Sequence, residues 1–377
     1  MDNKPTWISY ALADLHVGNP RLDPFHFQAC IEKYVIPQIQ KGVNHLFICG
    51  DYFDMLINMN SAASMIAVTV ISELKKACYE NGVKLRVLRG TFTHDRQQPK
   101  HFLVTSPEYN ACVKLFDTLS IEYDEESKMT FLYMPDNLKY ADIYEEVEHL
   151  LEAHHLEKVD VVIHHGYFKH MLPPGLPEPF GTLDYEKFKK YYSGCVLNGH
   201  VHVHSIFNNV ISVGSFDRMA YAEEEAKGFF KISKNEEGVY SFEFIENKDA
   251  HPYWTVDMRG FHEDHQKAFD WFTAEWMPKL SAEDRTIHIR IQSDDPGIVE
   301  GCKQIVTEKL NRVIVDRQAT TKREQIISNL NLELSDLPEI TPENLGTLLL
   351  DIIKDKHPNV DLQECLKVIE SLKEGKL

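Results

Sequence analysis

Short apolar stretches alternate along the first half of the chain with polar loops and with longer stretches of helical spacing. Short apolar runs that end in glycine or polar residues indicate buried strands, and apolar residues three and four positions apart indicate amphipathic helices. The expected strands are residues 7–13, 45–49, 84–89, 159–163 and 195–197, and the expected helices are residues 25–39, 62–79, 107–119 and 142–155. This alternation predicts an α/β fold.

The second half of the chain changes character twice. Strands alone are expected at residues 204–213, 228–232 and 239–245, so the first domain should span residues 1–247. A helix at 261–280, a strand at 286–291, a helix at 297–310 and a strand at 312–318 then predict a small α+β domain over residues 248–325. The N-cap and proline of Thr341-Pro342 open a last segment, residues 326–377, with helices expected at 345–353 and 362–372.

The charge of the chain is negative and unevenly distributed. A net charge of −18 over 377 residues weighs against a protein that binds nucleic acid through its overall field, so any such contact must be local. Acidic residues concentrate between positions 121 and 160, whereas residues 309–323 carry five basic side chains and one acidic one. The basic residues are Lys309, Arg312, Arg317, Lys322 and Arg323.

The cysteines and the apolar runs bear on the compartment. The seven cysteines are scattered, with no close pair that would indicate a disulfide framework or a thiolate zinc site. The longest apolar run, residues 61–71, is shorter than the roughly 20 residues of a membrane-spanning helix, and no signal-type segment opens the chain. We expect a soluble cytoplasmic protein without a membrane partner.

Polar loops with metal-ligand chemistry follow five of the expected strands. Loops at the carboxyl ends of strands meet at one crevice of an α/β sheet, so their side chains can assemble one site. The loops contain Asp14-Leu15-His16, Gly50-Asp51-Tyr52-Phe53-Asp54, Gly90-Thr91-Phe92-Thr93-His94-Asp95, His164-His165-Gly166 and Asn198-Gly199-His200-Val201-His202. Each loop alone is more often a turn or a surface segment, but their conjunction at successive strand ends indicates a functional site.

This series resembles the motifs of the calcineurin-like metallophosphoesterases, which are D-x-H, GD-x-x-D, GNH[DE], H and GHxH. The resemblance covers residues 6 to 232 and implies a sandwich of two mixed β-sheets flanked by helices. It also implies that one metal is held by Asp14, His16 and His202, that the other is held by His164 and His200, and that Asp51 bridges them. Manganese is the metal that the resemblance favours, with iron or zinc as alternatives, and imidazole and carboxylate ligands suit all three.

The third loop carries the expected catalytic groups and departs from the family. His94 corresponds to the histidine that donates to the phosphate or the leaving oxygen, with Asp95 and Asp54 placed to orient it. The asparagine ligand of the second metal has no counterpart, because Thr91-Phe92-Thr93 separate Gly90 from His94. Thr91, Thr93, His94 or water could complete the second metal. We interpret the remaining nearby histidines, His165, His170 and His204, as supporting or surface residues.

A further run indicates which phosphoester is cleaved. Residues 213–218, Val-Gly-Ser-Phe-Asp-Arg, precede Glu223 and Lys227-Gly228-Phe229, and they resemble the GS-x-x-R, E, KGF run of the SbcD family of DNA repair nuclease subunits. The resemblance implies manganese-dependent cleavage of DNA, a capping domain, a homodimer, and C-terminal helices that bind an SbcC-type coiled-coil ATPase. The basic residues at 309–323 are then candidate phosphate contacts, and a solvated basic face is the alternative.

Two other functions stay open on the sequence. A phosphodiesterase or phosphatase for small nucleotides needs no long basic surface, which agrees with the acidic balance of the chain. A scaffold with a degenerate metal site is the other alternative, and the absent asparagine supports it.

Overall fold

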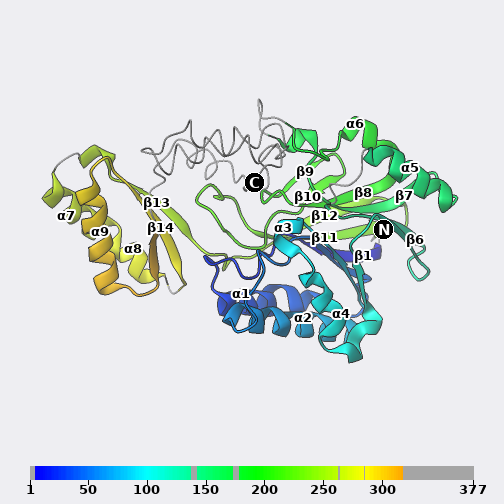
Figure 1. Cartoon of the computed structure of the whole chain (residues 1–377), viewed down its shortest axis with the longest axis horizontal. Coiled ribbons are helices and arrows are strands. Elements are labelled where there is room, and N and C mark those ends of the chain that lie inside the picture. The colour runs from blue at the N-terminus through cyan, green and yellow to red at the C-terminus, as the bar shows by residue number, and fades with distance from the viewer. Residues whose placement is uncertain (1–4, 137–141, 173–177, 262–263, 284, 317–377) are drawn as a thin grey trace, which may run out of the picture. The chain divides into compact units, whose positions relative to one another are not determined.

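The structure is a computed structural model that describes residues 5–136, 142–172, 178–261, 264–283 and 285–316. Two six-stranded mixed sheets form its larger part. The first has the order β12-β11-β1-β2-β3-β4, and the second has the order β5-β6-β7-β8-β10-β9. The expected α/β fold is confirmed, as two mixed sheets with helices on their outer faces (Figure 1).

The first sheet contains the first three expected strands. They are β1 (Pro5–Leu12), β2 (His45–Cys49) and β3 (Lys84–Leu88), which run parallel to one another. β11 (Gly228–Asn235) pairs antiparallel with β1, and β12 (Tyr240–Glu246) pairs antiparallel with β11. Strand β2 is buried at all five positions. Leu46 and Ile48 pack under the helices, while Phe47 and Cys49 face the second sheet, so both faces of β2 are covered by protein.

The second sheet is built around β6, β7, β8 and β10, which are parallel. Its strands are β5 (Ser120–Asp124), β6 (Met129–Met134), β7 (Val159–His165), β8 (Tyr192–Gly199), β9 (Ser205–Phe207) and β10 (Val210–Ser212). Side chains such as Trp7, Phe131 and Ile163 from both sheets form one buried cluster between them. The five polar loops follow the carboxyl ends of β1, β2, β3, β7 and β8.

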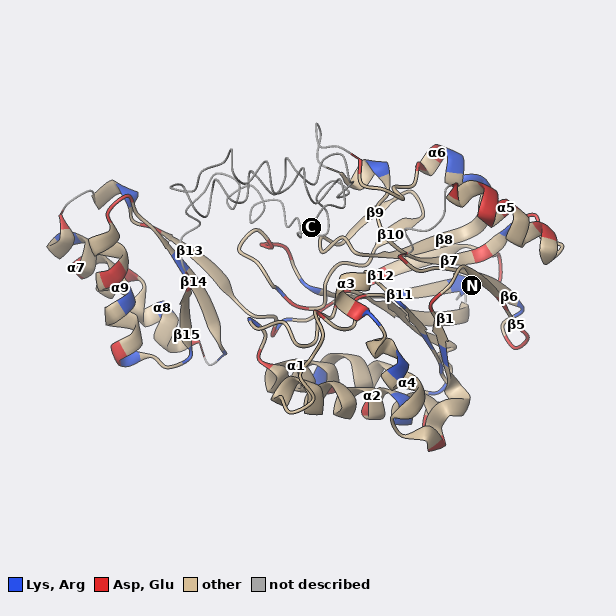
Figure 2. Cartoon of the chain, in the orientation of Figure 1, with Lys and Arg blue, Asp and Glu red and all other residues tan. Residues whose placement is uncertain are grey.

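Helices cover the outer face of each sheet. α1 (Pro24–Cys30) and α2 (Ala62–Asn81) pack on the first, and α5 (Ile143–Ala153) and α6 (Tyr185–Phe188) pack on the second (Figure 1). Ser61 caps α2 by accepting from the Ser64 amide at 3.1 Å, and Gly82 ends it in the left-handed conformation. Acidic residues colour much of α5 in Figure 2, in agreement with the acidic stretch of the sequence.

One expected helix is wrong. Residues 107–119 form a 3₁₀ helix (Pro107–Cys112) followed by strand β4 (Val113–Phe116). β4 pairs parallel to β3, with Val113 opposite Leu85, so pairing at the sheet edge overrides the local helical spacing. Short helices α3 (Phe92–Asp95) and α4 (His101–Val104) precede it.

A three-stranded parallel sheet lies in the part of the chain where the sequence predicts a small domain. Its strands are β13 (Tyr253–Asp257), β14 (Ile287–Gln292) and β15 (Val313–Asp316), and its helices are α7 (His265–Glu275), α8 (Met277–Ala282) and α9 (Pro296–Lys309). It has its own buried cluster, which includes Phe272, Ile289 and Val306. The expected C-terminal helices, Arg317, Lys322 and Arg323 lie outside the described residues. Within the described part of the chain, no helix has the length and apolar character needed to cross a bilayer.

Candidate metal centre

Four of the expected ligands occupy left-handed backbone conformations at the ends of their strands. The φ angle is 50° at Asp14, 47° at His16, 48° at Asp51 and 84° at His200. A side chain in this region costs roughly 1–2 kcal/mol, and such strain clusters at active sites and ligand clamps. The backbone is therefore strained at several positions where the sequence places metal ligands.

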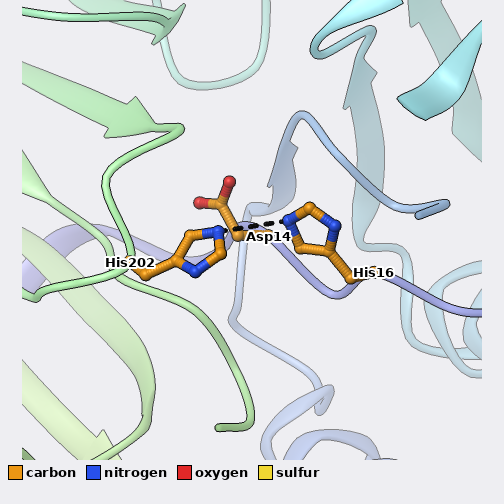
Figure 3. A group of neighbouring side chains, drawn as sticks. All are labelled: Asp14, His16 and His202. Carbon is orange, nitrogen blue, oxygen red and sulfur yellow. Dashed lines mark hydrogen bonds between the residues drawn. The ribbon is translucent and has the colours of Figure 1, made fainter. Parts of the chain in front are cut away.

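The first cluster contains Asp14, His16 and His202, each contributing one ligand atom within 4.8 Å of the others. His16 Nε2 and His202 Nε2 face each other at 3.2 Å (Figure 3). Behind them, Asp54 Oδ1 lies 3.0 Å from His16 Nδ1, and Glu223 Oε1 lies 3.0 Å from His202 Nδ1. Carboxylates on both Nδ1 atoms favour protons there, which leaves two lone pairs pointing at each other. A cation between them would remove that repulsion, so the donor set fits a metal.

Asp51, His165 and His200 form the second cluster. His165 Nδ1 donates to the Cys49 carbonyl at 2.8 Å, so its Nε2 is directed at Asp51 Oδ2, 3.1 Å away. Asp51 Oδ2 also lies 4.0 Å from His16 Nε2, which sets this carboxylate between the two clusters. Two of the three groups in each cluster are buried and the third, His202 or His200, is partly buried, and both clusters could hold metal ions.

The charges in the second cluster also favour a bound cation. Burial by itself lowers the pKa of His165. The negative charge of Asp51 and its hydrogen bond outweigh burial and raise this pKa to about 10. Burial alone would raise the pKa of Asp51, but His165 and His16 hold it below its usual range. The buried carboxylate thus requires a positive partner, which a proton supplies in the metal-free protein and a cation could supply instead.

His165 stands in this cluster where the sequence analysis expected His164. His164 Nδ1 instead donates to Asn198 Oδ1 at 2.5 Å, and burial lowers the pKa of His164 to about 3. Strand alternation gives the reason: Ile163 and His165 face the space between the sheets, and His164 lies on the opposite face of β7. Val161, Val162 and Ile163 are all apolar and buried, so the sequence before the two histidines shows no alternation that would reveal this phase.

Thr91 contacts all three members of the second cluster. Its hydroxyl lies 3.3 Å from His165 Nε2 and 3.3 Å from His200 Nδ1, and its amide donates to Asp51 Oδ1 at 2.6 Å. Of the replacements left open by the sequence, Thr91 is thus within hydrogen-bond distance of two members of the second cluster. An oxygen donor is retained there in hydroxyl form.

Gly50 allows the second cluster to assemble. Its φ is 94°, and a Cβ atom at this position would stand 2.1 Å from His165 Nδ1 and 2.8 Å from the Gly90 Cα atom. Only glycine leaves room for the two loops and the imidazole to approach this closely.

His94 lies beside the first cluster, and its two expected partners act differently. The His94 ring packs edge-on to His16 at a centroid distance of 4.9 Å, and Nδ1 donates to the Asp54 carbonyl. Asp54 thereby orients His94 through its main chain and His16 through its side chain. Asp95 accepts from the Phe53 and Gly90 amides at 3.0 and 2.7 Å, so it ties the second loop to the third.

The run from Gly214 to Phe229 supports the first cluster from behind. Lys227 Nζ lies 2.9 Å from Glu223 Oε2 and donates to the His202 carbonyl at 3.0 Å. Arg218 donates to the carbonyls of Glu223 and Glu225 at 3.0 and 3.1 Å. The arginine, glutamate and lysine of this run therefore make contacts that fix His202.

Sequence reasoning missed the place of His165 in the second cluster, Glu223 as a partner of His202, and Asp136. Burial raises the pKa of Asp136, and the charges of His165, His200 and Asp51 act on it. Asp136 follows β6, so the rule that placed the other loops would have found it had residues 129–134 been recognised as a strand. Of the basic candidates, Lys309 ends α9, and Arg312 Nη2 donates to the Ser281 carbonyl at 2.9 Å.

Comparisons with known proteins leave the family open. No protein-family model matches the chain, and no curated protein matches it. The crystal structure of TT1561 from Thermus thermophilus aligns with 63% of this chain and 98% of its own, at 10% identity and a TM-score of 0.35. A second solved structure aligns with 64% of this chain and 100% of its own, at 13% identity and a TM-score of 0.38. Similarity at this level carries no argument about function.

Proposed function

We propose that the chain is a two-metal phosphoesterase of the calcineurin-like type that hydrolyses phosphodiester bonds in DNA. The observation that carries the proposal is the pair of adjoining histidine and aspartate clusters, with Asp51 between them and His94 beside them. Buried groups of this kind, arranged at strand ends on strained backbone, are typical of catalytic sites.

In this proposal Asp14, His16 and His202 would hold one divalent ion, His165 and His200 would hold a second, and Asp51 would serve both. When bound, two such ions clamp a phosphate, increase the acidity of a coordinated water and stabilise the leaving oxygen. Manganese is our first choice, with iron or zinc as alternatives. Asp54 and Glu223 keep the Nε2 atoms of His16 and His202 directed inward, and Thr91 completes the second ligand set.

His94 is the proposed proton donor. Its Nδ1 donates to the Asp54 carbonyl, and in this proposal Nε2 is the atom that faces the substrate. With both ring nitrogens protonated, Nε2–H can donate to a phosphate oxygen and pass its proton to the departing 3′ or 5′ oxygen. The Asp54 carbonyl fixes the ring orientation that this transfer needs.

The choice of DNA rests on the Gly214 to Phe229 run and on the small domain that follows it. Together they support the nuclease subunit of an SbcCD-like DNA repair and recombination complex. In that assignment, Lys309 and Arg312 are candidate phosphate contacts, and an SbcC-type ATPase and a second copy of the chain are the expected partners. Exposed Met65 and Val68 on α2 are candidates for the homodimer face.

The test is DNA cleavage by the purified chain. Single- and double-stranded oligonucleotides would be incubated with manganese, with and without an SbcC-type ATPase, and the Asp51→Asn variant would serve as control. We expect cleavage by wild type and loss of it in the variant. Absence of cleavage by manganese-loaded wild type, or equal cleavage by the variant, contradicts the proposal.

A small-nucleotide phosphodiesterase or phosphatase is the second candidate, favoured by the net charge of −18. The same metal chemistry would then act on a substrate that needs no extended basic surface. Turnover of bis(p-nitrophenyl) phosphate that excess DNA fails to inhibit would support this candidate over a nuclease.

A further inference from the structure

The loop after β3 carries an exposed aromatic side chain beside the candidate metal centre. Phe92 begins α3 and is 57% exposed. It lies between Thr91, which contacts the second cluster, and the proposed proton donor His94. Among the described residues, Phe92 belongs to none of the buried clusters and has no ring partner. Its aromatic face is therefore accessible to a ligand.

Hydrogen bonds fix the backbone of the turn that carries Phe92. The Thr91 carbonyl accepts the amides of His94 and Asp95 at 3.1 and 2.9 Å. The buried Asp95 carboxylate in turn accepts the Gly90 amide at 2.7 Å. Single exposed apolar residues are common on protein surfaces. Phe92 differs from most of them because its backbone is held in place within two residues of a proposed catalytic group.

Basic side chains lie on the same segment of the chain. Residues 89–100 contain Arg89, Arg96 and Lys100, and basic residues colour the stretch between α3 and α4 in Figure 2. These three side chains, called the basic group below, line one small hollow together with Asp117. Within the described part of the chain, none of the three forms an ion pair. The basic group therefore carries positive charge that the described carboxylates leave uncompensated.

Arg89 connects the basic group to the candidate metal centre. It directly follows β3, and its Nε atom is buried without a hydrogen-bond partner among the described residues. Burial raises the pKa of Asp136, which feels the charges of the second cluster, and the positive charge of Arg89 acts against this rise. The basic group thus influences the place where the proposed reaction would bind a phosphate, so adjoining phosphates of the same strand would also meet positive charge.

We propose that residues 89–100 form a binding site for single-stranded DNA, with a base stacked on Phe92 and neighbouring phosphates at Arg96 and Lys100. The inference rests on the proposed function and names the form of DNA that the site accepts. Aromatic faces among basic side chains are typical of single-strand binding, because any base can stack and the phosphates need positive charge. In an intact duplex the bases stack on one another, so an unpaired strand is the occupant that fits Phe92. The local positive charge is compatible with a chain whose net charge is −18.

Binding can be measured without cleavage, from the fluorescence anisotropy of labelled oligothymidylate mixed with the full chain in a chelator. Phe92→Ala should weaken binding about 5- to 150-fold, and Phe92→Trp should retain it. Phe25→Ala is the matched control, because Phe25 on α1 is also 57% exposed, and it should bind like wild type. A strand of abasic nucleotides should bind wild type and Phe92→Ala equally, because it has no base to stack.

The basic group has a separate readout, which is the salt dependence of binding. For a single strand, each phosphate contact that is lost should lower the slope of log affinity against log salt by about 0.7. Arg96→Asn and Lys100→Ala should each show this change, and asparagine also tolerates the φ of 48° at position 96. Phe92→Ala should leave the slope unchanged. Lys41→Ala, which replaces an exposed lysine before β2, should leave both slope and affinity unchanged.

The outcomes separate this inference from the proposed function. Absence of binding by wild type, or equal binding by wild type and Phe92→Ala, overturns the inference even if the manganese-loaded chain cleaves DNA. Single-strand binding that depends on Phe92, Arg96 and Lys100 supports the inference even if no DNA is cleaved, and the nuclease proposal alone would then fail. Tighter binding of the fully paired oligonucleotide than of the single strand also overturns it.

Discussion

Replacing one or the other of two adjacent histidines tests the geometry of the second cluster. In His165→Ala, the buried Asp51 carboxylate loses the imidazole that lies 3.1 Å from it. Breaking a buried charged pair costs about 3–5 kcal/mol, because one charge is left uncompensated. We therefore expect the metal-free variant to unfold at a markedly lower temperature, and manganese to recover part of the loss by supplying positive charge to Asp51.

The same replacement should reduce metal binding. Losing a group that merely supports a ligand typically costs 10- to 100-fold in metal affinity, so losing a ligand should cost about 100-fold or more at the second ion. Isothermal titration with manganese, with the stoichiometry checked by metal analysis, measures this directly. Hydrolysis of bis(p-nitrophenyl) phosphate should fall in parallel.

His164→Ala is the matched control. The low pKa of His164 keeps it neutral at pH 7, so its loss removes one neutral hydrogen bond to Asn198 and some packing, about 1–3 kcal/mol of stability. Metal affinity should stay within a few-fold of wild type. A His164→Ala protein that loses the second ion, beside a His165→Ala protein that keeps it, would refute the strand-phase argument.

Three further predictions test the support of the site and the fold. Glu223→Gln should weaken manganese binding about 10- to 100-fold by titration, whereas exposed Glu224→Gln should not. Gly50→Ala should cost about 1–3 kcal/mol more in urea unfolding than Gly42→Ala, because both have a φ of 94° but a Cβ atom meets a neighbour only at Gly50. Burial by itself raises the pKa of Asp124, but hydrogen bonds from Lys84 and Ser127 lower this pKa to about 2. Wild type should therefore be more stable than Asp124→Asn above pH 4 and lose that advantage towards pH 2, and a constant difference would contradict this assignment.

The strand-end loops could be predicted because an apolar run and the glycine or polar residues that end it are local properties of the sequence. β2 shows this well, since five consecutive apolar or aromatic residues led directly into Gly50 and Asp51. The phase of β7 could not be predicted, because both faces of the strand are buried and Val161, Val162 and Ile163 are all apolar, so no alternation shows which histidine faces the neighbouring sheet. A pair of adjacent histidines offers no local signal to separate them.

Long-range pairing explains the other differences. Residues 113–116 have helical spacing, but the edge of β3 is available to them and they join it as a strand. β5 was missed because Glu122 makes the segment look exposed, whereas Arg86 Nε and Nη2 bind this carboxylate at 2.8 and 2.9 Å in the interior. The fold decides which charged side chains find buried partners, and these partners cannot be predicted from the sequence pattern alone.

The left-handed backbone at Asp14, His16, Asp51 and His200 has a consequence for how this protein can change. At each position, glycine would relieve strain and asparagine would tolerate it better, yet either would remove a proposed ligand. Selection for stability alone should therefore enrich glycine or asparagine here, while selection for hydrolysis should retain the present side chains. A library sorted once for thermal resistance and once for turnover would separate the two pressures position by position.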